Sequence, residues 1–268
     1  MNVDGYTTMR FERRDRVLTV FLDNPAESER SDDAAVHDEL GRLMRDLRDE
    51  REARAVVLTG SGKDFFTGLR DPAGSLLWQR EAGLGVIDAG HQVARRLIWD
   101  LLDVEVPIVA ALGGDASTLG ATIAMSCDAI FMADTATLRD PHVQIGVVAG
   151  DGAAAIWPLA MGPALAKRYL LTGDPISAED AARMGIVTHV CTRETVLAEA
   201  TAFAERLAAA APLAIRYTKM AVNKVVKDAI GGAFEQGLGH EMLTFMSDDM
   251  VEALTAARES RTPTFHGK

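Results

Sequence analysis

The chain is poor in cysteine and in basic residues, and it has no long apolar run. Its two cysteines among 268 residues, Cys127 and Cys191, fit neither the spacing of metal ligands nor a disulfide framework. Acidic residues outnumber Lys and Arg by 39 to 28, which argues against nucleic acid or an anionic membrane as the main partner. No apolar run reaches the roughly 18 residues that a membrane-spanning helix needs, and residues 1–10 hold no apolar signal segment. We therefore expect a cytoplasmic protein that acts on a small molecule.

Hydrophobic residues make up 48% of the chain, enough for one large α/β domain or two modest ones. Their periodicity alternates between strand and helix, which is typical of a mostly parallel sheet. Strands are expected over 16–23, 54–60, 107–112, 129–133 and 137–139. Helices are expected over 34–51, 86–102, 120–127, 177–185, 193–211, 212–226, 229–246 and 248–260. The segment 65–85 is predicted to be a loop because it contains Gly68, Pro72 and Gly74. We expect a core over residues 1–195 and a helical region over 196–268.

A histidine and an aspartate stand nine residues apart, at His142 and Asp151, separated by a short apolar run and a glycine-flanked turn. Such a loop can fold back so that the carboxylate orients the imidazole. A histidine titrates near neutral pH, and a carboxylate partner fixes its tautomer and raises its basicity. The alternative is a structural histidine and an aspartate that caps the helix expected from about Ala153.

The order of motifs along nearly the whole chain resembles the crotonase superfamily, the enoyl-CoA hydratase/isomerase family. The matching residues include 18–25, 56–60, 65–68, 107–111, Gly114, Gly120, 127–128, Pro141, 145–146, 162–164, 171–173, 176–179, Gly185 and 257–265. The resemblance implies an α/β fold, the crotonase (ClpP-like) spiral of ββα units, with a helical C-terminal region that serves as a trimerisation or lid element. It also implies a homotrimer or dimer of trimers, no permanently bound cofactor, and coenzyme A as part of the substrate.

The resemblance further implies an oxyanion hole, in which two backbone N–H groups hold a thioester carbonyl as it becomes an enolate. By motif position these donors are the amides of Leu69, which follows Gly68, and of Leu119. Leu119 also opens the helix that contains Gly120, where the positive end of the helix dipole favours negative charge. The alternative is that both segments are ordinary turns.

Two departures from the family concern its acid–base residues. A typical hydratase places glutamates at the positions held here by Thr122 and His142, so the usual two-carboxylate hydration cannot run. The aspartate of the isomerases is replaced by Gly150, and the acid stands one residue later, at Asp151. A His–Asp pair at this spacing resembles the 6-oxocamphor hydrolase and β-diketone hydrolase branch. That branch also uses a C-terminal glutamate; Glu241 is at a compatible position, although it could equally be structural.

Several side chains are candidates for substrate binding. Lys219 lies in a segment like the family's and, with Lys224, Arg258 and Arg261, could bind the phosphates of coenzyme A, unless these residues form solvated helix faces. Trp78 could line the acyl pocket or pack in the core or a lid, and Gly68 and Thr122 complete the predicted substrate-binding set. The remaining histidines, His91 among them, share no metal-binding spacing, so no metal is expected.

The sequence leaves three hypotheses open. The first is an enzyme that stabilises the enolate oxyanion of an acyl-CoA thioester, with His142–Asp151 as the general base. The second is a β-diketone hydrolase that cleaves a C–C bond by a retro-Claisen reaction without coenzyme A. The third is a non-catalytic acyl-CoA binder.

Overall fold

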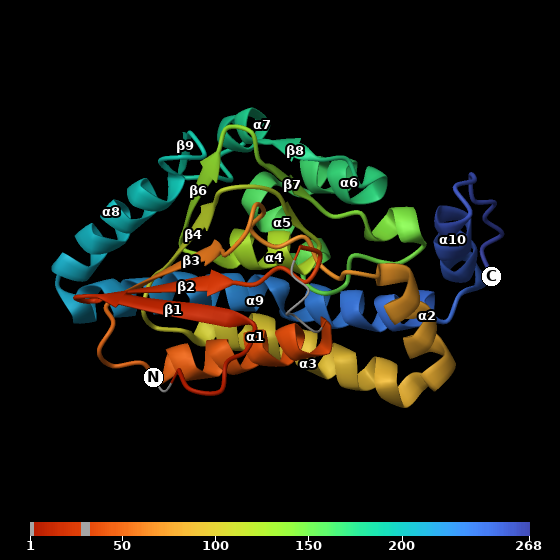
Figure 1. Cartoon of the computed structure of the whole chain (residues 1–268), viewed down its shortest axis with the longest axis horizontal. Coiled ribbons are helices and arrows are strands. Elements are labelled where there is room, and N and C mark those ends of the chain that lie inside the picture. The colour runs from red at the N-terminus through yellow and green to blue at the C-terminus, as the bar shows by residue number, and fades with distance from the viewer. Residues whose placement is uncertain (1–2, 28–32) are drawn as a thin grey trace.

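The computed structural model describes residues 3–27 and 33–268 as an α/β fold built on two sheets (Figure 1). The large sheet has the strand order β1-β2-β3-β4-β6-β9. Its strands are β1 (Met9–Arg14), β2 (Val17–Leu22), β3 (Ala55–Gly60), β4 (Ile108–Leu112), β6 (Ala129–Ala133) and β9 (His189–Cys191). The β1 strand is antiparallel to β2, and every other pair is parallel. The expected α/β class with a mostly parallel sheet is confirmed.

The two faces of the large sheet follow the period of two along its strands. One face, which includes Val57, Val109 and Phe131, packs against α8 (Val196–Ala209). The other face, which includes Val56 and Ile108, packs into the main core with α1 (Asp33–Arg48) and α3 (Leu84–Asp103). Helices on both faces explain why these strands read as continuous apolar runs.

A small second sheet has the order β5 (Ala116–Ser117), β7 (Thr137–Arg139) and β8 (Ile176–Ser177). The chain visits the large sheet, then the small one, and then forms a helix. The consecutive strands β4 and β5, one in each sheet, are followed by α4 (Leu119–Ser126). The consecutive strands β6 and β7 are followed by a short 3₁₀ helix, η1 (His142–Ile145), and then by α5 (Ala153–Met161). This repetition is the predicted spiral of ββα units.

The helical regions differ from the expectation in two places. The further helices are α2 (Pro72–Ala82), α6 (Pro163–Thr172), α7 (Ala178–Arg183), α9 (Pro212–Phe245) and α10 (Asp248–Arg258). The prediction of a loop over 65–85 is wrong, because Asp71 caps α2 by accepting a hydrogen bond from the Gly74 amide at 2.9 Å, and Pro72 occupies the first helical position. The prediction of separate helices over 212–226 and 229–246 is also wrong, since α9 is continuous through Gly231 and Gly232.

Packing explains the continuity of α9, because its buried face lies against α3 and α5 along the length of the molecule (Figure 1). A glycine in a helix costs about 1 kcal/mol relative to alanine, which the burial of Phe234 and Leu238 can offset. The strand β1 and the short strands β8 and β9 were not expected either. The division at residue 195 stays a prediction, although α8 and α9 pack directly on the preceding part of the chain.

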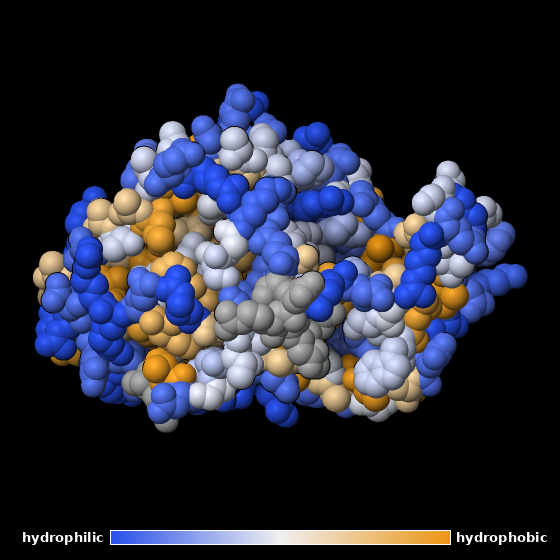
Figure 2. Space-filling model, viewed as in Figure 1, coloured by the Kyte–Doolittle hydropathy of each residue, from blue (hydrophilic) through white to orange (hydrophobic). Residues whose placement is uncertain are grey.

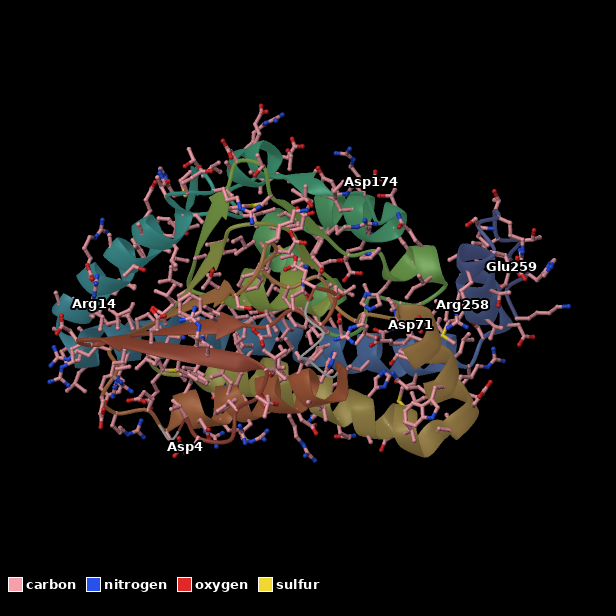
Figure 3. The ribbon with its side chains drawn as sticks, viewed as in Figure 1. Asp4, Arg14, Asp71, Asp174, Arg258 and Glu259 are labelled. Atoms are coloured by element: carbon pink, nitrogen blue, oxygen red, sulfur yellow. The ribbon has the colours of Figure 1, made fainter. Side chains whose placement is uncertain are left out.

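The C-terminal helix α10 lies against α2 and closes one end of the molecule. Arg258 of α10 lies 3.5 Å from Asp71 at the start of α2 (Figure 3), and Arg80 of α2 donates a hydrogen bond to Asp248 at 2.8 Å. Beneath them is a small apolar cluster that includes Leu76, Phe245 and Met250. Figure 2 shows charged residues over most of this face, with apolar patches near α8 and near α10. Within the described residues no helix is both long and apolar enough to cross a membrane.

Candidate active site

Three segments that carry predicted site residues leave the small sheet at the same edge. Phe66 pairs in parallel with Ala116 of β5, and β5 pairs in parallel with β7. Because parallel strands end at a common edge, the residues that follow them lie close together, namely segments 67–69, 118–119 and 140–142. Ligands of α/β proteins bind at such carboxyl ends of strands. From this common edge we expect the predicted oxyanion donors to lie near the predicted histidine.

The amides of Leu69 and Leu119 are available as hydrogen-bond donors. Within residues 3–27 and 33–268, neither donates to a backbone carbonyl. Their segments touch, since a Cβ added to Gly68 would lie 3.3 Å from Thr118 Oγ1, and Gly68 adopts the positive φ of 103° that favours glycine. Leu119 opens α4, so its amide has no partner within the helix. Convergence of the two donors on one oxygen stays a prediction.

The residue before the second donor, Thr118, is strained. Its φ of 52° and ψ of −126° are rare for a β-branched side chain, and such a conformation costs on the order of 1–3 kcal/mol. The Thr118 amide donates to the Arg139 carbonyl at 3.1 Å, and its hydroxyl donates to the Ser117 carbonyl at 2.7 Å. These bonds hold the turn that orients the Leu119 amide, and strain of this kind often accompanies functional sites.

His142 is held by a carboxylate other than the expected one. Its Nδ1 lies 2.6 Å from Asp140 Oδ1, and its backbone amide donates to the same oxygen at 3.1 Å. The two side chains are 12% and 0% exposed. Because the carboxylate accepts, Nδ1 carries the proton, and Nε2 is left as the nitrogen that can exchange a proton with a ligand. Asp140 makes the hydrogen bond to the ring, because the tight turn into η1 brings it there first; the pairing of His142 with Asp151, directly or through one water molecule, stays a prediction.

Asp151 lies next to this pair and keeps one oxygen unpaired. It precedes Gly152, the N-cap of α5, which makes no side-chain capping bond, and among the described residues its Oδ1 is buried without a hydrogen-bond partner. Asp140, His142 and Asp151 each offer one ligand atom, and these three atoms lie within 4.8 Å of one another. The capping alternative is therefore not what the structure shows, and Asp151 belongs to the histidine cluster.

The electrostatics of the cluster raise the pKa values of both His142 and Asp151. Burial lowers the pKa of His142, but the charges of Asp140, Asp151 and Glu241 and the hydrogen bond to Asp140 outweigh it and raise that pKa to about 10. Burial, with the charges of Glu241 and Asp140, raises the pKa of Asp151 to about 7, although the His142 charge and the Ala153 amide lower it. Near neutral pH the ring is an imidazolium, and Asp151 changes its charge in the range suited to proton transfer.

The helix α9 brings Glu241 to the opposite side of the histidine. Glu241 Oε1 lies 4.0 Å from His142 Nε2, and its side chain is 7% exposed. The loop before Asp151 approaches α9 so closely that a Cβ at Gly150 would collide with the Gly237 carbonyl. A glycine at position 150 thus allows the loop and the helix to meet, and the structure brings the predicted residues His142, Asp151 and Glu241 together.

Thr122 occupies the site without any acid–base function of its own. It is fully buried in α4, and its Oγ1 has no hydrogen-bond partner within the described residues. A Cβ added to Gly152 would lie 2.8 Å from Thr122 Cγ2, so the threonine borders the Asp151 loop. A hydroxyl here has too high a pKa to replace a carboxylate as a base.

Two predicted substrate-binding residues have other environments. Trp78 lies on α2 with 61% of its surface exposed, so it is not a buried pocket wall in this chain. Lys219 Nζ lies 2.7 Å from Asp128 Oδ2 and donates to the Val106 carbonyl at 2.9 Å, with the side chain 7% exposed. The assignment of Lys219 to coenzyme A phosphates is corrected, because its ammonium ties α9 to the region around β4.

The other basic candidates also pair with carboxylates. Lys224 pairs with Asp228, Arg258 lies 3.5 Å from Asp71, and Arg261 binds Glu252 through two nitrogens at 2.5 and 2.8 Å. These pairs are exposed, and such pairs contribute little stability and open easily. No basic side chain predicted to bind phosphate is therefore presented without a counter-ion in this chain.

Asp140, His142 and Asp151 are also the residues that could hold a metal ion, because their ligand atoms lie so close together. Two carboxylates and an imidazole form a donor set that divalent metals accept. The bond from Nδ1 to Asp140 already uses one of these donors. The arrangement fits an Asp–His acid–base unit directly.

The sequence interpretation missed Asp140 and His91. An aspartate two residues before a histidine was a visible signal for the first. For His91, which lies on α3 with its Nε2 3.5 Å from Glu241 Oε2, no local signal exists. Only the packing of α3 against α9 brings the two side chains together.

A model of the enoyl-CoA hydratase/isomerase family matches residues 12–268. The chain belongs to the enoyl-CoA hydratase/isomerase family. It is 30% identical to a probable enoyl-CoA hydratase of Mycobacterium tuberculosis, over 97% of this chain and 98% of that protein. Membership confirms the crotonase fold with its helical C-terminal region.

Two solved structures illustrate the range of this family. An enoyl-CoA hydratase/isomerase from Mycobacterium paratuberculosis has a TM-score of 0.86 and 31% identity, covering 94% of this chain and 99% of that chain. A β-diketone hydrolase from the cyanobacterium Anabaena, bound to (S)-3-oxocyclohexyl acetic acid, has a TM-score of 0.81 and 27% identity, covering 90% and 95%. This family member is thus similar both to proteins named for acyl-CoA chemistry and to one named for diketone hydrolysis.

Proposed function

We propose that this enzyme moves protons at the carbon next to the carbonyl of an acyl-CoA thioester, through an enolate that the Leu69 and Leu119 amides stabilise. The His142–Asp151 pair is the general acid–base unit in place of the family's usual two glutamates. The observation that carries this proposal is the buried Asp140–His142–Asp151 cluster, at the sheet edge that also holds the two amides. Coenzyme A is part of the substrate and no cofactor is held permanently.

The acid and base roles divide between the two members of the pair. Asp151, when ionised, accepts a proton from the α-carbon or from a water molecule, and the electron pair moves to the carbonyl oxygen. The Leu69 and Leu119 amides stabilise the negative charge on that oxygen without reorganising. The imidazolium of His142 then returns a proton through Nε2, while Asp140 holds Nδ1. The pKa of Asp151, raised to about 7, suits a base at neutral pH better than the more basic His142 does.

A second candidate function is the hydrolysis of a C–C bond in a β-diketone. Here the pair activates water to attack a ketone carbonyl, and cleavage of the neighbouring C–C bond leaves an enolate on the same two amides. The likeness to the β-diketone hydrolase favours this candidate, and so does the buried ion pair that holds Lys219 away from a phosphate. A substrate without coenzyme A needs no phosphate site.

Calorimetry with coenzyme A and turnover of two substrate panels, acyl-CoA thioesters and cyclic β-diketones, separate the candidates. Coenzyme A binding with thioester turnover supports the first candidate. Diketone turnover without coenzyme A binding overturns it in favour of the second. Coenzyme A binding without turnover in either panel identifies a non-catalytic acyl-CoA binder.

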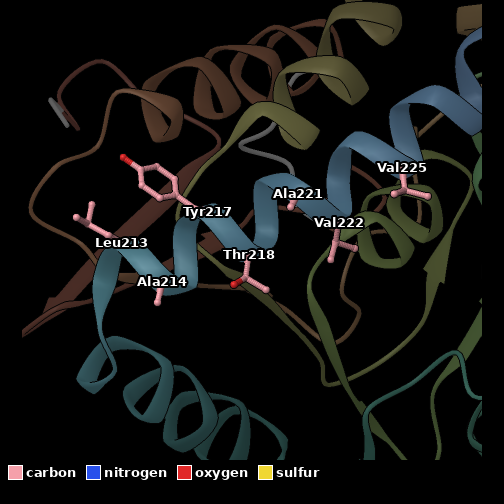
Figure 4. Close-up of a pocket in the computed structure, with 7 residues that line it drawn as sticks. All are labelled: Leu213, Ala214, Tyr217, Thr218, Ala221, Val222 and Val225. Carbon is pink, nitrogen blue, oxygen red and sulfur yellow. The ribbon is translucent and has the colours of Figure 1, made fainter.

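We also propose that the chain forms a homotrimer or a dimer of trimers. The support is an apolar stripe along the first turns of α9, where Leu213, Tyr217, Val222 and Val225 are exposed at helical spacing (Figure 4). An unpaired apolar face of this kind marks an interaction site. Light scattering of the purified chain gives the assembly mass, and Val222→Glu should shift that mass towards the monomer.

A further inference from the structure

Glu241 lies between two histidines that come from different parts of the chain. His91 Nε2 on α3 is 3.5 Å from Glu241 Oε2, and His142 Nε2 is 4.0 Å from Glu241 Oε1. Each imidazole thus faces its own carboxylate oxygen. The His91 side chain is 10% exposed and the Glu241 side chain 7%. A buried carboxylate needs such compensation, because an unpaired buried charge is strongly unfavourable.

The ring of His91 is fixed in orientation. Its Nδ1 lies 2.9 Å from the Ile87 carbonyl, and its ring packs edge-on against Phe245 with centroids 5.8 Å apart. A carbonyl oxygen can only accept a hydrogen bond, so Nδ1 carries the proton and Nε2 is the nitrogen that faces Glu241. The ring therefore interacts with the carboxylate through the one nitrogen whose protonation varies.

We propose that His91 is a positioning residue that holds Glu241 beside the Nε2 of His142 and offsets the charge of Glu241 there. This inference rests on the proposed function of the His142–Asp151 pair. His91 has no direct contact with the pair in this arrangement. His91 acts by offsetting the negative charge of Glu241, which would otherwise act only on His142 and Asp151.

The charges that face these groups come from several elements. His142 is faced by Asp140 after β7, by Asp151 before α5 and by Glu241 from α9. His91 is faced by Glu241 and by Asp88 of its own helix, and although burial lowers its pKa, the contacts with Glu241 and Ile87 raise it overall. Three carboxylates therefore surround one imidazole at the reacting end, and His91 is the second imidazole that faces one of them.

The sign of each perturbation follows from these charges. Replacing His91 by glutamine removes a positive charge next to Glu241, so the pKa values of His142 and Asp151 should both rise. Replacing Glu241 by glutamine removes a negative charge, so both should fall. A charge at this range shifts a pKa by about one unit or more. Because His91 acts through Glu241, His91→Gln should have no further effect in the Glu241→Gln background.

The experiment is a titration of the histidine ring nitrogens by ¹⁵N NMR, together with the pH profile of kcat/KM. The variants are His91→Gln, Glu241→Gln and their double, with His240→Gln as the matched control, because His240 is an exposed neighbour of Glu241 on α9. We expect His91→Gln to move the His142 titration and the acidic limb of the profile upward by about one unit. Glu241→Gln should move both downward, and His240→Gln should move neither.

Two results would overturn the inference. One is a His91→Gln variant that titrates like the His240→Gln control, and the other is a shift of equal size with and without Glu241. If His91→Gln fails to fold, Glu241→Gln tests the inference alone. Loss of the Glu241 charge must then lower the pKa of the His91 ring, and an unchanged pKa would overturn the inference. An NMR coupling in a protein that turns over no substrate would contradict the proposed function and leave the role of His91 intact.

Discussion

The replacement of Asp140 by asparagine tests the acid–base unit most simply. The Asp140 carboxylate is 0% exposed, and one of its oxygens accepts from both the Nδ1 and the backbone amide of His142, at 2.6 and 3.1 Å. Asparagine keeps the shape and removes the charge. An opposite charge this close raises the pKa of a histidine by about 1–3 units, so the pKa of His142 should fall from about 10 towards neutrality. The asparagine oxygen can still accept from Nδ1, so the ring keeps its orientation but loses the charge that favours the imidazolium.

A loss of about 10²–10⁴-fold in kcat is expected from this change, because that is the usual contribution of a positioned acid–base residue. The assay combines turnover with ¹⁵N NMR titration of His142. The matched control is Asp174→Asn, since Asp174 is an exposed aspartate at the surface of the molecule (Figure 3). An Asp140→Asn variant with full activity and an unchanged His142 titration would refute the reasoning, whatever happens to its stability.

The remaining predictions address other parts of the site. Leu69→Pro removes an oxyanion donor and should cost about 2.7–4 kcal/mol of transition-state stabilisation, whereas Leu69→Ala, which keeps the N–H, should cost little; equal losses in steady-state kinetics would argue against the backbone donor. Hydration of crotonyl-CoA should be weak, and the double change Thr122→Glu, His142→Glu should increase it; efficient hydration by the wild type would show that another acid serves. Asp151→Asn should lower activity and raise the Tm. The folded-state pKa of Asp151 is raised to about 7 from 3.8, so the stability that it contributes is present below pH 3.8 and is lost as pH rises through 7. The gain in Tm should therefore be larger at pH 8 than at pH 4, and a gain independent of pH in calorimetry would be inconsistent.

The strands and the spiral were predictable because their signals are local or cover the whole chain. The apolar runs of β2, β3, β4 and β6 mark buried parallel strands, and the order of motifs indicates the family. The helix α2 was missed because the dipeptide Asp71-Pro72 is typical of both a loop and the start of a helix. The long α9 was divided at Lys227 and Asp228, and only its packing against α3 and α5 shows that the helix continues through them.

Part of the candidate site was predicted from the sequence, while its contacts, Asp140 and His91 were not. Spacing identified His142 and Asp151, yet it could not show that Asp140 reaches the imidazole first, because that depends on the turn into η1. The internal ion pair of Lys219 with Asp128 depends in the same way on how α9 meets the sheet. His91 reaches the site through contacts between distant helices, which periodicity does not encode.

The central claim is that His142 and Asp151 move a proton on a substrate whose carbonyl is held by the Leu69 and Leu119 amides. The most direct measurement is the exchange of the α-protons of saturated and β-oxo acyl-CoA thioesters into D₂O, followed by NMR, in the wild type and in His142→Gln, Asp151→Asn and Leu69→Pro. The account predicts enzyme-dependent exchange at the α-carbon in the wild type and its loss, by about 10²-fold or more, in each of the three variants. Exchange that persists in the His142 and Asp151 variants, or no exchange with any thioester, would contradict it.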